Sequence, residues 1–298
     1  MTRIKFKIRA IITTMRLPHW LKNTLVFIPL LTSHQLTNTD MLVKNLFIFL
    51  AFSFSASGVY FLNDVLDLQA DKHHHEKKSR PIASGQLSPR MGVICGIFYL
   101  LVGIGIAFSI SMNLLAILIV YIVLAVSYSI KLKSYLILDV LCLSAFYTIR
   151  VIAGMVGLAL YFSPWLLIFS MFMFLSLGFI KRSSELHNLR LFKEEKAKGR
   201  GYVEADLEHL TRMGIAAGYN AVLVLALYIN SDQIRSMYVT PEWLWLLCPI
   251  VVYWISRMWM ITNRGNMPED PVMFAIKDRP SLGIVITIFS VMVLAMVS

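Results

Sequence analysis

The residues best suited to chemistry are four oxygen-bearing side chains spaced for one face of a helix. Asn63, Asp64, Asp67 and Asp71 lie in the stretch N-D-V-L-D-L-Q-A-D. If one α-helix runs through this stretch, 3.6 residues per turn places all four within an arc of about 100°. Like charges on one helix face repel each other unless a cation lies among them. Mg²⁺ prefers carboxylate oxygens and substrate phosphates as ligands, so we predict that these four residues hold Mg²⁺ and that the three aspartates are catalytic.

The alternative interpretation of this segment is a solvated acidic helix end. Acidic residues are scarce, however: the whole chain has 17, and three share this face. The following stretch, H-H-E-K-K-S-R-P-I-A-S-G from His74 to Gly85, changes to basic. Cations beside a metal-binding acidic face suit a phosphate-rich substrate. We therefore predict that Asn63, Lys77 and Arg80 bind such a substrate.

Membrane-spanning helices must position these residues. The chain is 57% hydrophobic and 15% charged, with a mean hydropathy of +0.68, whereas charged residues make up about a quarter of a soluble protein. A helical span needs about 20 largely apolar residues. Nine apolar runs lie near residues 17–36, 41–62, 91–112, 114–130, 135–158, 163–180, 210–229, 241–262 and 280–297. We predict an all-α, polytopic membrane protein with nine transmembrane helices in one domain over residues 1–298, the first run being the least regular.

The basic residues predict the orientation of the chain in the membrane. All but four of the 28 lysine and arginine residues fall in segments on one side of the nine runs. By the positive-inside rule this side is cytoplasmic, which places the N-terminus inside, the C-terminus outside and the protein in the inner (cytoplasmic) membrane. The net charge of +11 is then a topology signal and does not indicate nucleic-acid binding. Residues 1–22 are predicted to lie on the membrane surface, and residues 63–90 and 181–212 to form cytoplasmic catalytic loops.

Further polar residues have competing interpretations. Asp139 and Arg150 lie in one apolar run, and charges inside a membrane are functional candidates by default, although Arg150 could instead join helices through a salt bridge. The tract His73 to His75 is better explained as a solvated loop than as a metal site, because adjacent side chains on a helix do not converge. Glu204, Asp206 and Glu208 are typical of a solvated helix start, but the sequence leaves open whether they reach the site.

The pattern N-D-x-x-D-x-x-x-D followed by K-x-x-R-P-I-A-x-G resembles the first signature of the UbiA-type intramembrane transferases. Over nearly the whole chain, the resemblance narrows to the polyprenyl-phosphate phosphoribosyltransferase branch. The elements that carry it are Trp20, Lys22 and Asn23 (W-x-K-N), Tyr128 with Leu132 and Lys133, R-V-I-A-G from Arg150, K-R-S-S-E-L from Lys181, and Pro268, Glu269 and Asp270 with Asp278 and Arg279.

This resemblance implies a UbiA-like helical bundle with its active site at the cytoplasmic side. It also implies Mg²⁺-dependent transfer of 5-phosphoribose from phosphoribosyl diphosphate to a decaprenyl-like polyprenyl phosphate, for cell-envelope glycan synthesis. The expected substrate-binding residues are then Lys22, Tyr128, Lys133, Arg150, Lys181, Arg182 and Glu185, in addition to those of the acidic motif. The family places a histidine at the position of His74, which makes that residue a candidate phosphate contact.

Two alternative functions remain at this point. Prenyl-diphosphate users of the superfamily resemble each other in a second aspartate-rich motif, where this chain has Lys181, Arg182 and Glu185. The basic pair favours phosphoribosyl diphosphate over a prenyl diphosphate, but a UbiA-type aromatic prenyltransferase is the first alternative. A transporter is the second, weakened because the informative charges gather at one face and not at the bilayer midplane. The prenyl chain length and the oligomeric state, including a homo-oligomer, are left open.

Overall fold

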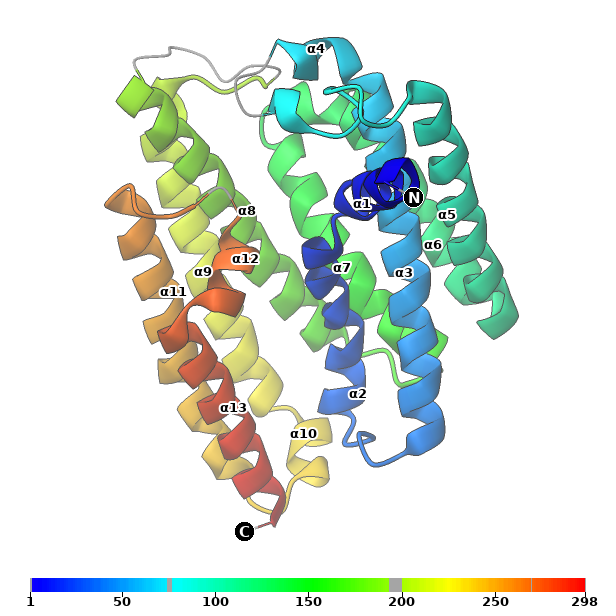
Figure 1. The fold of residues 1–298 in the computed structure, drawn as a ribbon. Coiled ribbons are helices and arrows are strands. Elements are labelled where there is room, and N and C mark those ends of the chain that lie inside the picture. The colour runs from blue at the N-terminus through cyan, green and yellow to red at the C-terminus, as the bar shows by residue number, and fades with distance from the viewer. Residues whose placement is uncertain (1, 74–76, 193–199, 269, 298) are drawn as a thin grey trace. The chain divides into compact units, whose positions relative to one another are not determined.

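The protein is helical throughout, as the sequence predicts. The structure, a computed structural model, describes residues 2–73, 77–192, 200–268 and 270–297, and no strand occurs in these ranges. The α-helices (Figure 1) are α1 (Thr2–Met15), α2 (Ile28–Thr32), α3 (Thr39–Leu66), α4 (Leu68–Lys72), α5 (Pro89–Ile110), α6 (Met112–Ile130), α7 (Leu138–Gly157), α8 (Pro164–Phe192), α9 (Leu207–Ile229), α10 (Asp232–Met237), α11 (Leu247–Asn263), α12 (Pro271–Lys277) and α13 (Arg279–Val297). The 3₁₀ segments are η1 (Leu17–Phe27), η2 (Lys77–Ser79), η3 (Leu132–Ser134), η4 (Glu204–Asp206) and η5 (Pro241–Leu246).

The chain divides into two compact units. The first comprises Met1–Ile130 and Ile149–Phe162, and the second comprises Lys131–Thr148 and Ser163–Ser298. The division falls within α7, which begins in the second unit and ends in the first. The single domain over residues 1–298 therefore stays a prediction.

Helix α3 forms the centre of the first unit. It contacts α5, α6, α1 and η1, and its most apolar stretch is 61% buried, compared with 17% for α5 and 22% for α6. Small residues allow the close packing of α5: a Cβ atom at Gly103 would lie 2.7 Å from the carbonyl oxygen of Ala51. Between membrane helices such small residues are typical of close contacts. The acidic motif thus begins at the end of a helix that is far more buried than its neighbours α5 and α6.

Eight helical segments of the described chain are long and apolar enough to cross a membrane. They correspond to the second through ninth runs of the sequence prediction. The first run contains η1 and the short helix α2, and falls below that length. Because a 3₁₀ helix rises about 2.0 Å per residue and an α-helix about 1.5 Å, η1 and α2 together extend about 30 Å, the thickness of the hydrocarbon core. Segment η1 packs against α3 (Figure 1), so a ninth crossing remains a proposal.

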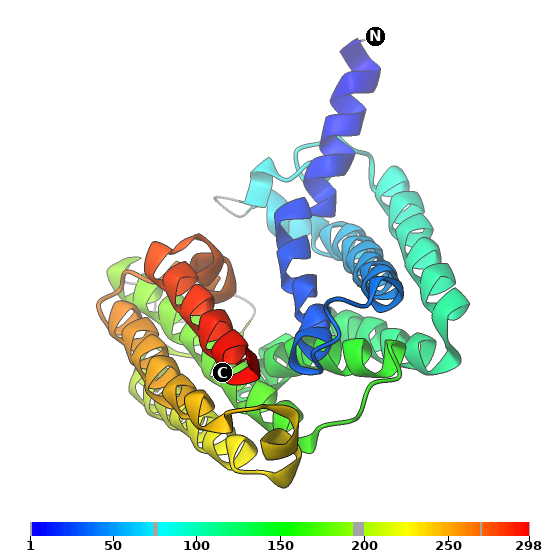
Figure 2. The same ribbon diagram turned by 90° about the horizontal axis from the view of Figure 1, so that it is seen from below.

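Helix α1 differs from the spans in both direction and surface. Figures 1 and 2 show its axis lying across that of α3 and not along it. Ala10 and Met15 are buried and belong to a cluster with Phe61, whereas Ile8 and Ile12 are exposed. An exposed apolar face on a helix that lies across α3 suits the membrane surface. The surface location of residues 1–22 stays a prediction.

Helices α8 and α9 form the core of the second unit, with α11 packed against both. The hydroxyl of Ser176 donates to the carbonyl oxygen of Gly214 at 2.7 Å and accepts from the indole N–H of Trp259 at 3.1 Å. Helix α8 continues well past the apolar run into the segment that begins at Lys181. No glycine or proline interrupts it there, and Lys, Arg, Glu and Leu are strong helix formers, so the predicted catalytic loop at 181–212 begins as helix.

Candidate active site

The acidic motif is nearly one continuous helix, with a break at Asp67. Helix α3 ends at Leu66 and α4 begins at Leu68. The amide of Asp67 still donates to the carbonyl oxygen of Asn63, and that of Asp71 to Asp67, both at 2.8 Å. Asp64 and Asp71 are 2% and 3% exposed. The helical spacing on which the sequence prediction depended is therefore present, and two of the three carboxylates are buried.

Two arginines neutralise these buried carboxylates. Arg80 Nη1 lies 2.6 Å from Asp71 Oδ2 and 3.2 Å from Asp64 Oδ1. Arg16 Nη2 lies 2.7 Å from the same Asp64 oxygen, and its guanidinium stacks over the ring of Tyr60 at 4.6 Å. Burial of a carboxylate requires such compensation. The structure brings Arg80 to the acidic face, as the sequence predicts, and adds Arg16.

Sequence reasoning missed Arg16 because its position depends on backbone geometry. Arg16 follows α1 and has φ = 53°, in the left-handed region. This conformation is uncommon for residues other than glycine. It redirects the chain between α1 and η1. The available signal was a basic residue just before Leu17 and Pro18, the first two residues of the next helical segment.

The oxygen atoms of the motif fit a hard divalent cation. The side-chain oxygen of Asn63 is buried and accepts no hydrogen bond from any described residue, and a buried acceptor without a partner is unfavourable. Carboxylate and amide oxygens are the ligands that Mg²⁺ prefers. Within the described ranges, no three His, Cys, Asp or Glu side chains are gathered closely enough to hold a metal ion. The donor types of the motif fit Mg²⁺, but in this structure Asp64 and Asp71 are paired with guanidinium groups and are not arranged as a metal site.

A buried polar group in the first unit contains Arg150. Its Nε donates to the side-chain oxygen of Asn23 at 2.7 Å, and its Nη2 to the hydroxyl of Tyr121 at 3.2 Å. Arg150 is 5% exposed, and its guanidinium lies 4.9 Å from the centre of the Tyr121 ring. The W-x-K-N and R-V-I-A-G elements therefore meet in space.

The other predicted residues lie in several different helical segments. Lys22 is half-buried in η1, Tyr128 is half-buried near the end of α6, and Lys133 is half-buried in η3. Lys77 is exposed in η2. Lys181 is half-buried on α8.

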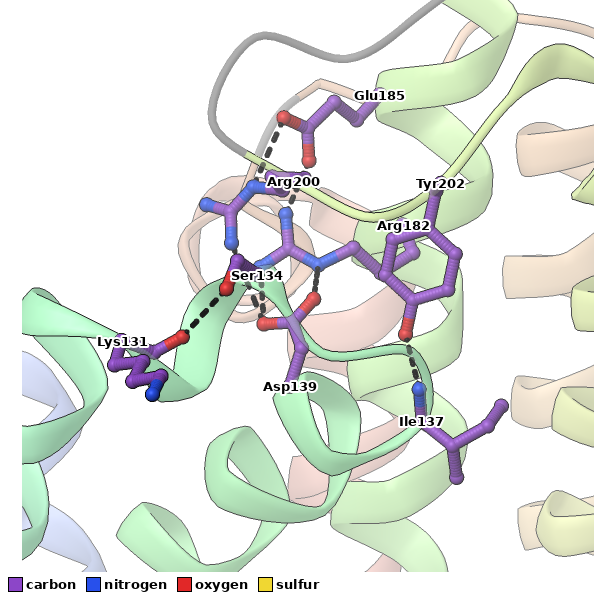
Figure 3. Close-up of polar contacts among 8 residues, drawn as sticks. All are labelled: Lys131, Ser134, Ile137, Asp139, Arg182, Glu185, Arg200 and Tyr202. Atoms are coloured by element: carbon purple, nitrogen blue, oxygen red, sulfur yellow. Dashed lines mark hydrogen bonds and ion pairs between the residues drawn. The ribbon is translucent and has the colours of Figure 1, made fainter.

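A second cluster of charges lies within the second unit (Figure 3). Arg182 is 1% exposed, and its Nε lies 2.5 Å from Asp139 Oδ2. Its Nη1 is paired with Glu185. Arg200 reaches both acids, with Nε 3.2 Å from Glu185 Oε1 and Nη1 3.3 Å from Asp139 Oδ1. The predicted residues Arg182 and Glu185 thus meet, together with Asp139 and Arg200, and the formal charges balance.

Tyr202 borders this cluster and was not predicted as a site residue. The amide of Ile137 donates to its hydroxyl at 2.9 Å (Figure 3). Tyr202 is 2% exposed, and this burial raises the pKa of its phenol above the ordinary value. The phenol therefore stays protonated at neutral pH.

The remaining acidic candidates make local contacts. Asp206 accepts the amide of Val203 at 3.0 Å, and Glu208 forms an exposed pair with Arg212 one helical turn later. These contacts agree with a solvated start of α9. His73 contacts the carbonyl oxygen of Gln69 at 2.8 Å. His74, His75 and Glu269 lie outside the described residues.

Two aspartates of the motif near the end of the chain, Asp270 and Asp278, cap helices. Asp270 accepts the amide of Met273 at the start of α12. Asp278 binds Arg257 through both oxygens, at 2.7 and 2.9 Å, and accepts the amide and hydroxyl of Ser281 at the start of α13. Burial alone would raise the pKa of Asp278, but these hydrogen bonds outweigh it and hold the pKa below its ordinary value.

The class of protein follows from a match of most of the chain to the model of one protein family. A model of the UbiA prenyltransferase family matches residues 25–279, and the chain belongs to this family. The structure is similar to that of a UbiA homologue from Archaeoglobus fulgidus bound to GPP and Mg²⁺, with a TM-score of 0.70 and 14% identity over 95% of this chain and 99% of that one. At this identity the likeness shows the fold alone.

Relatives with similar sequences carry different names. The nodulation protein NoeC of Azorhizobium caulinodans is 35% identical over 269 residues, which are 89% of this chain and 86% of that one. The decaprenyl-phosphate phosphoribosyltransferase of Mycolicibacterium smegmatis is 26% identical over 281 residues, or 91% and 87% of the two chains. The protein y4nM of Sinorhizobium fredii is 32% identical over 96% of this chain, which spans only 55% of that relative.

Proposed function

We propose that this protein transfers 5-phosphoribose from phosphoribosyl diphosphate to a polyprenyl phosphate, and releases diphosphate. The observation that carries the proposal is the pairing of Arg16 and Arg80 with buried Asp64 and Asp71. Oxygen ligands beside guanidinium groups suit a diphosphate bound with Mg²⁺. The name of the Mycolicibacterium smegmatis relative supports the particular reaction, which remains a proposal because the more identical NoeC names no substrate.

The proposed metal ligands are Asn63, Asp64, Asp67 and Asp71. Mg²⁺ held there supplies positive charge to the departing diphosphate. The chain adds Arg16, Lys77 and Arg80, whose N–H groups form charge-assisted hydrogen bonds with phosphate oxygens. Lys181 is assigned to the donor as well. Arg182 and Glu185, which the sequence assigns to the donor, are proposed here to hold the second cluster of charges together.

The acceptor is proposed to need positioning and no general base. A phosphate monoester has its second pKa near about 6, so the lipid phosphate is already an anion at neutral pH. Lys22 and Lys133 supply positive charge near helix ends, and Tyr128 and Arg150 supply further hydrogen-bond donors. The lipid phosphate attacks ribose C1 as the bond to diphosphate breaks. This displacement inverts C1 and gives a β-linked lipid, so an α-linked product by NMR, or a ribosylated protein by mass spectrometry, would contradict it.

The site is proposed to face the cytoplasm in the inner membrane, where the soluble donor is made. This orientation requires nine crossings with the N-terminus inside and the C-terminus outside, in a single UbiA-like domain. The one-sided distribution of lysine and arginine supports it. The lipid product would serve cell-envelope glycan synthesis.

The decisive experiment uses the full chain in detergent without any ion gradient. Purified protein is incubated with Mg²⁺, labelled phosphoribosyl diphosphate and polyprenyl phosphates, and the lipid product is identified by mass. We expect polyprenylphosphoryl-5-phosphoribose, lost in Asp71→Asn and retained in Asp40→Asn, because Asp40 is exposed at the other end of α3. Prenylation of an aromatic acid from a polyprenyl diphosphate would support the aromatic prenyltransferase. Substrate movement that requires a gradient, without any product, would support a transporter.

A further inference from the structure

The turn that leads into α7 has a strained backbone at Ile137. This residue has φ = 63°, and the amide of Leu138 donates to the carbonyl oxygen of Leu136 at 2.6 Å. A three-residue turn of this kind around a positive φ is rare and strained. A β-branched side chain makes the conformation still less favourable. Such strain persists only where the surroundings impose it.

The segment Gly201–Tyr202 imposes this conformation. The hydroxyl of buried Tyr202 accepts the amide of Ile137 at 2.9 Å (Figure 3). Gly201 packs against the same turn, where a Cβ atom would lie 2.6 Å from the carbonyl oxygen of Ser134. A side chain at position 201 would therefore displace the turn, whereas glycine lets Tyr202 reach it.

This turn carries Lys133, which is assigned to the lipid acceptor, and leads to Asp139 of the second cluster of charges. Lys133 lies in η3, and the hydroxyl and the amide of Ser134 both donate to the carbonyl oxygen of Lys131. Asp139 lies two residues after Ile137 in the first turn of α7, and it accepts from Arg182 and Arg200. The backbone conformation at Ile137 therefore sets the positions of Lys133 and Asp139 relative to each other.

We propose that Gly201 and Tyr202 are positioning residues that hold the turn from Lys131 to Asp139 in its strained form, so that Lys133 is placed for the phosphate group of the lipid acceptor. The role of Lys133 rests on the proposed function, whereas the restraint on the turn does not. In the competing explanation Tyr202 only fills space in the core. Phenylalanine would then serve equally well, because it keeps the ring and loses only the acceptor oxygen.

The restraint is tested without any assay of activity. Hydrogen–deuterium exchange of the turn, measured by mass spectrometry on the full chain in nanodiscs, compares Tyr202→Phe, Ile137→Gly, the double variant and the control Tyr253→Phe. Tyr253 is an exposed tyrosine of α11. Loss of one hydrogen bond should speed exchange in Tyr202→Phe by on the order of tenfold. Glycine adopts positive φ readily, so the double variant should regain much of the protection.

The outcomes separate the restraint from the positioning role. Unchanged exchange in Tyr202→Phe overturns the restraint. If Tyr202→Phe fails to fold, recovery of the fold by Ile137→Gly supports the restraint, and failure to recover overturns it.

The kinetic measurement then tests positioning. In Tyr202→Phe we expect the KM for polyprenyl phosphate to rise about three- to tenfold, the effect of one hydrogen bond. The KM for phosphoribosyl diphosphate should stay unchanged. The double variant should recover part of the rise in the KM for polyprenyl phosphate. An unchanged KM for the lipid alongside faster exchange overturns the positioning role. Absence of phosphoribosyl transfer in the unmodified protein refutes the proposed function and leaves the exchange result valid.

Discussion

Removal of the Arg182 guanidinium tests whether this residue holds the second cluster together or contacts the donor. Arg182 and Asp139 are 1% and 0% exposed, and their closest atoms are 2.5 Å apart. Arg182→Met would remove the closer guanidinium from buried Asp139 and leave Arg200, 3.3 Å away, to compensate its charge in part. Breaking a buried ion pair in this way destabilises a protein by about 3–5 kcal/mol. Because Arg200 compensates in part, we expect the lower end of that range.

Thermal unfolding in detergent measures this effect. A loss of about 3 kcal/mol should lower the Tm by roughly 5 °C for a chain of this size. The double variant Asp139→Leu with Arg182→Met should recover most of the loss, because Arg200 and Glu185 remain as a neutral pair at 3.2 Å and apolar replacements of a buried pair are tolerated. Arg212→Met is the matched control. Its pair with Glu208 is exposed, and such pairs contribute little.

The two roles of Arg182 predict different results. If Arg182 holds the cluster, Arg182→Met lowers the Tm. The double variant then restores the Tm and returns the KM for phosphoribosyl diphosphate most of the way to its value in the unmodified protein. An unchanged Tm with a raised KM for this donor would refute our reasoning. Arg182 would then contact the donor directly, as the basic pair in the sequence indicates.

Three further predictions follow from the sites described above. Asp64→Asn should lower turnover by at least about 10²-fold, whereas the control Asp40→Asn should not. Chelation of Mg²⁺ should abolish activity until Mg²⁺ is restored, and full activity of Asp64→Asn would exclude a role for the acidic motif. Asp278→Asn should lower the Tm at pH 7. Because the pKa of Asp278 is depressed in the folded protein, its contribution is present above the ordinary carboxyl pKa and is lost as the pH falls through the depressed value. The Tm difference should therefore shrink in acid, below the ordinary carboxyl pKa; a difference that grows in acid would contradict this sign. A cysteine replacing Gln35 should react with a membrane-impermeant label from outside, and one replacing Ser79 only from inside; outside labelling at Ser79 would exclude a cytoplasmic site.

The helical architecture was predictable because its signals are local. Nine apolar runs were predicted, and eight of them coincide with helices long and apolar enough to cross a membrane, since length and hydropathy determine which segments can cross a bilayer. The first run was harder. Its polar and proline interruptions pointed to irregularity, and the segment consists of η1 and a short α2. Hydropathy also marks where an apolar surface ends and not where a helix ends, which is why α8 continues through Lys181.

The candidate site was predictable only in part. The sequence predicted that Asp64, Asp71 and Arg80 lie close together, because all three fall within a short stretch of chain. Arg16 and Tyr202 depend on distant contacts, which lie 48 and 65 residues apart in the sequence from their partners Asp64 and Ile137. Nothing in a local pattern specifies such a pairing. The strained turn at Ile137 is equally hidden, because isoleucine is among the last residues that a sequence would place at positive φ.

The two charge clusters share one physical constraint that bears on how substrates enter. In each, arginines neutralise at least one carboxylate that is almost fully buried, namely Asp64 and Asp71 in the first and Asp139 in the second. Removing the partner of such a carboxylate strongly destabilises the protein. Arg16 and Arg80 each carry five N–H donors in a fixed fork, more than the contacts with Asp64 and Asp71 occupy. They can therefore reach phosphate oxygens while they still contact the carboxylates. Because Arg16 directly follows α1, which packs through Ala10 and Met15 against Phe61, the packing of α1 helps to place the guanidinium of Arg16 beside Asp64.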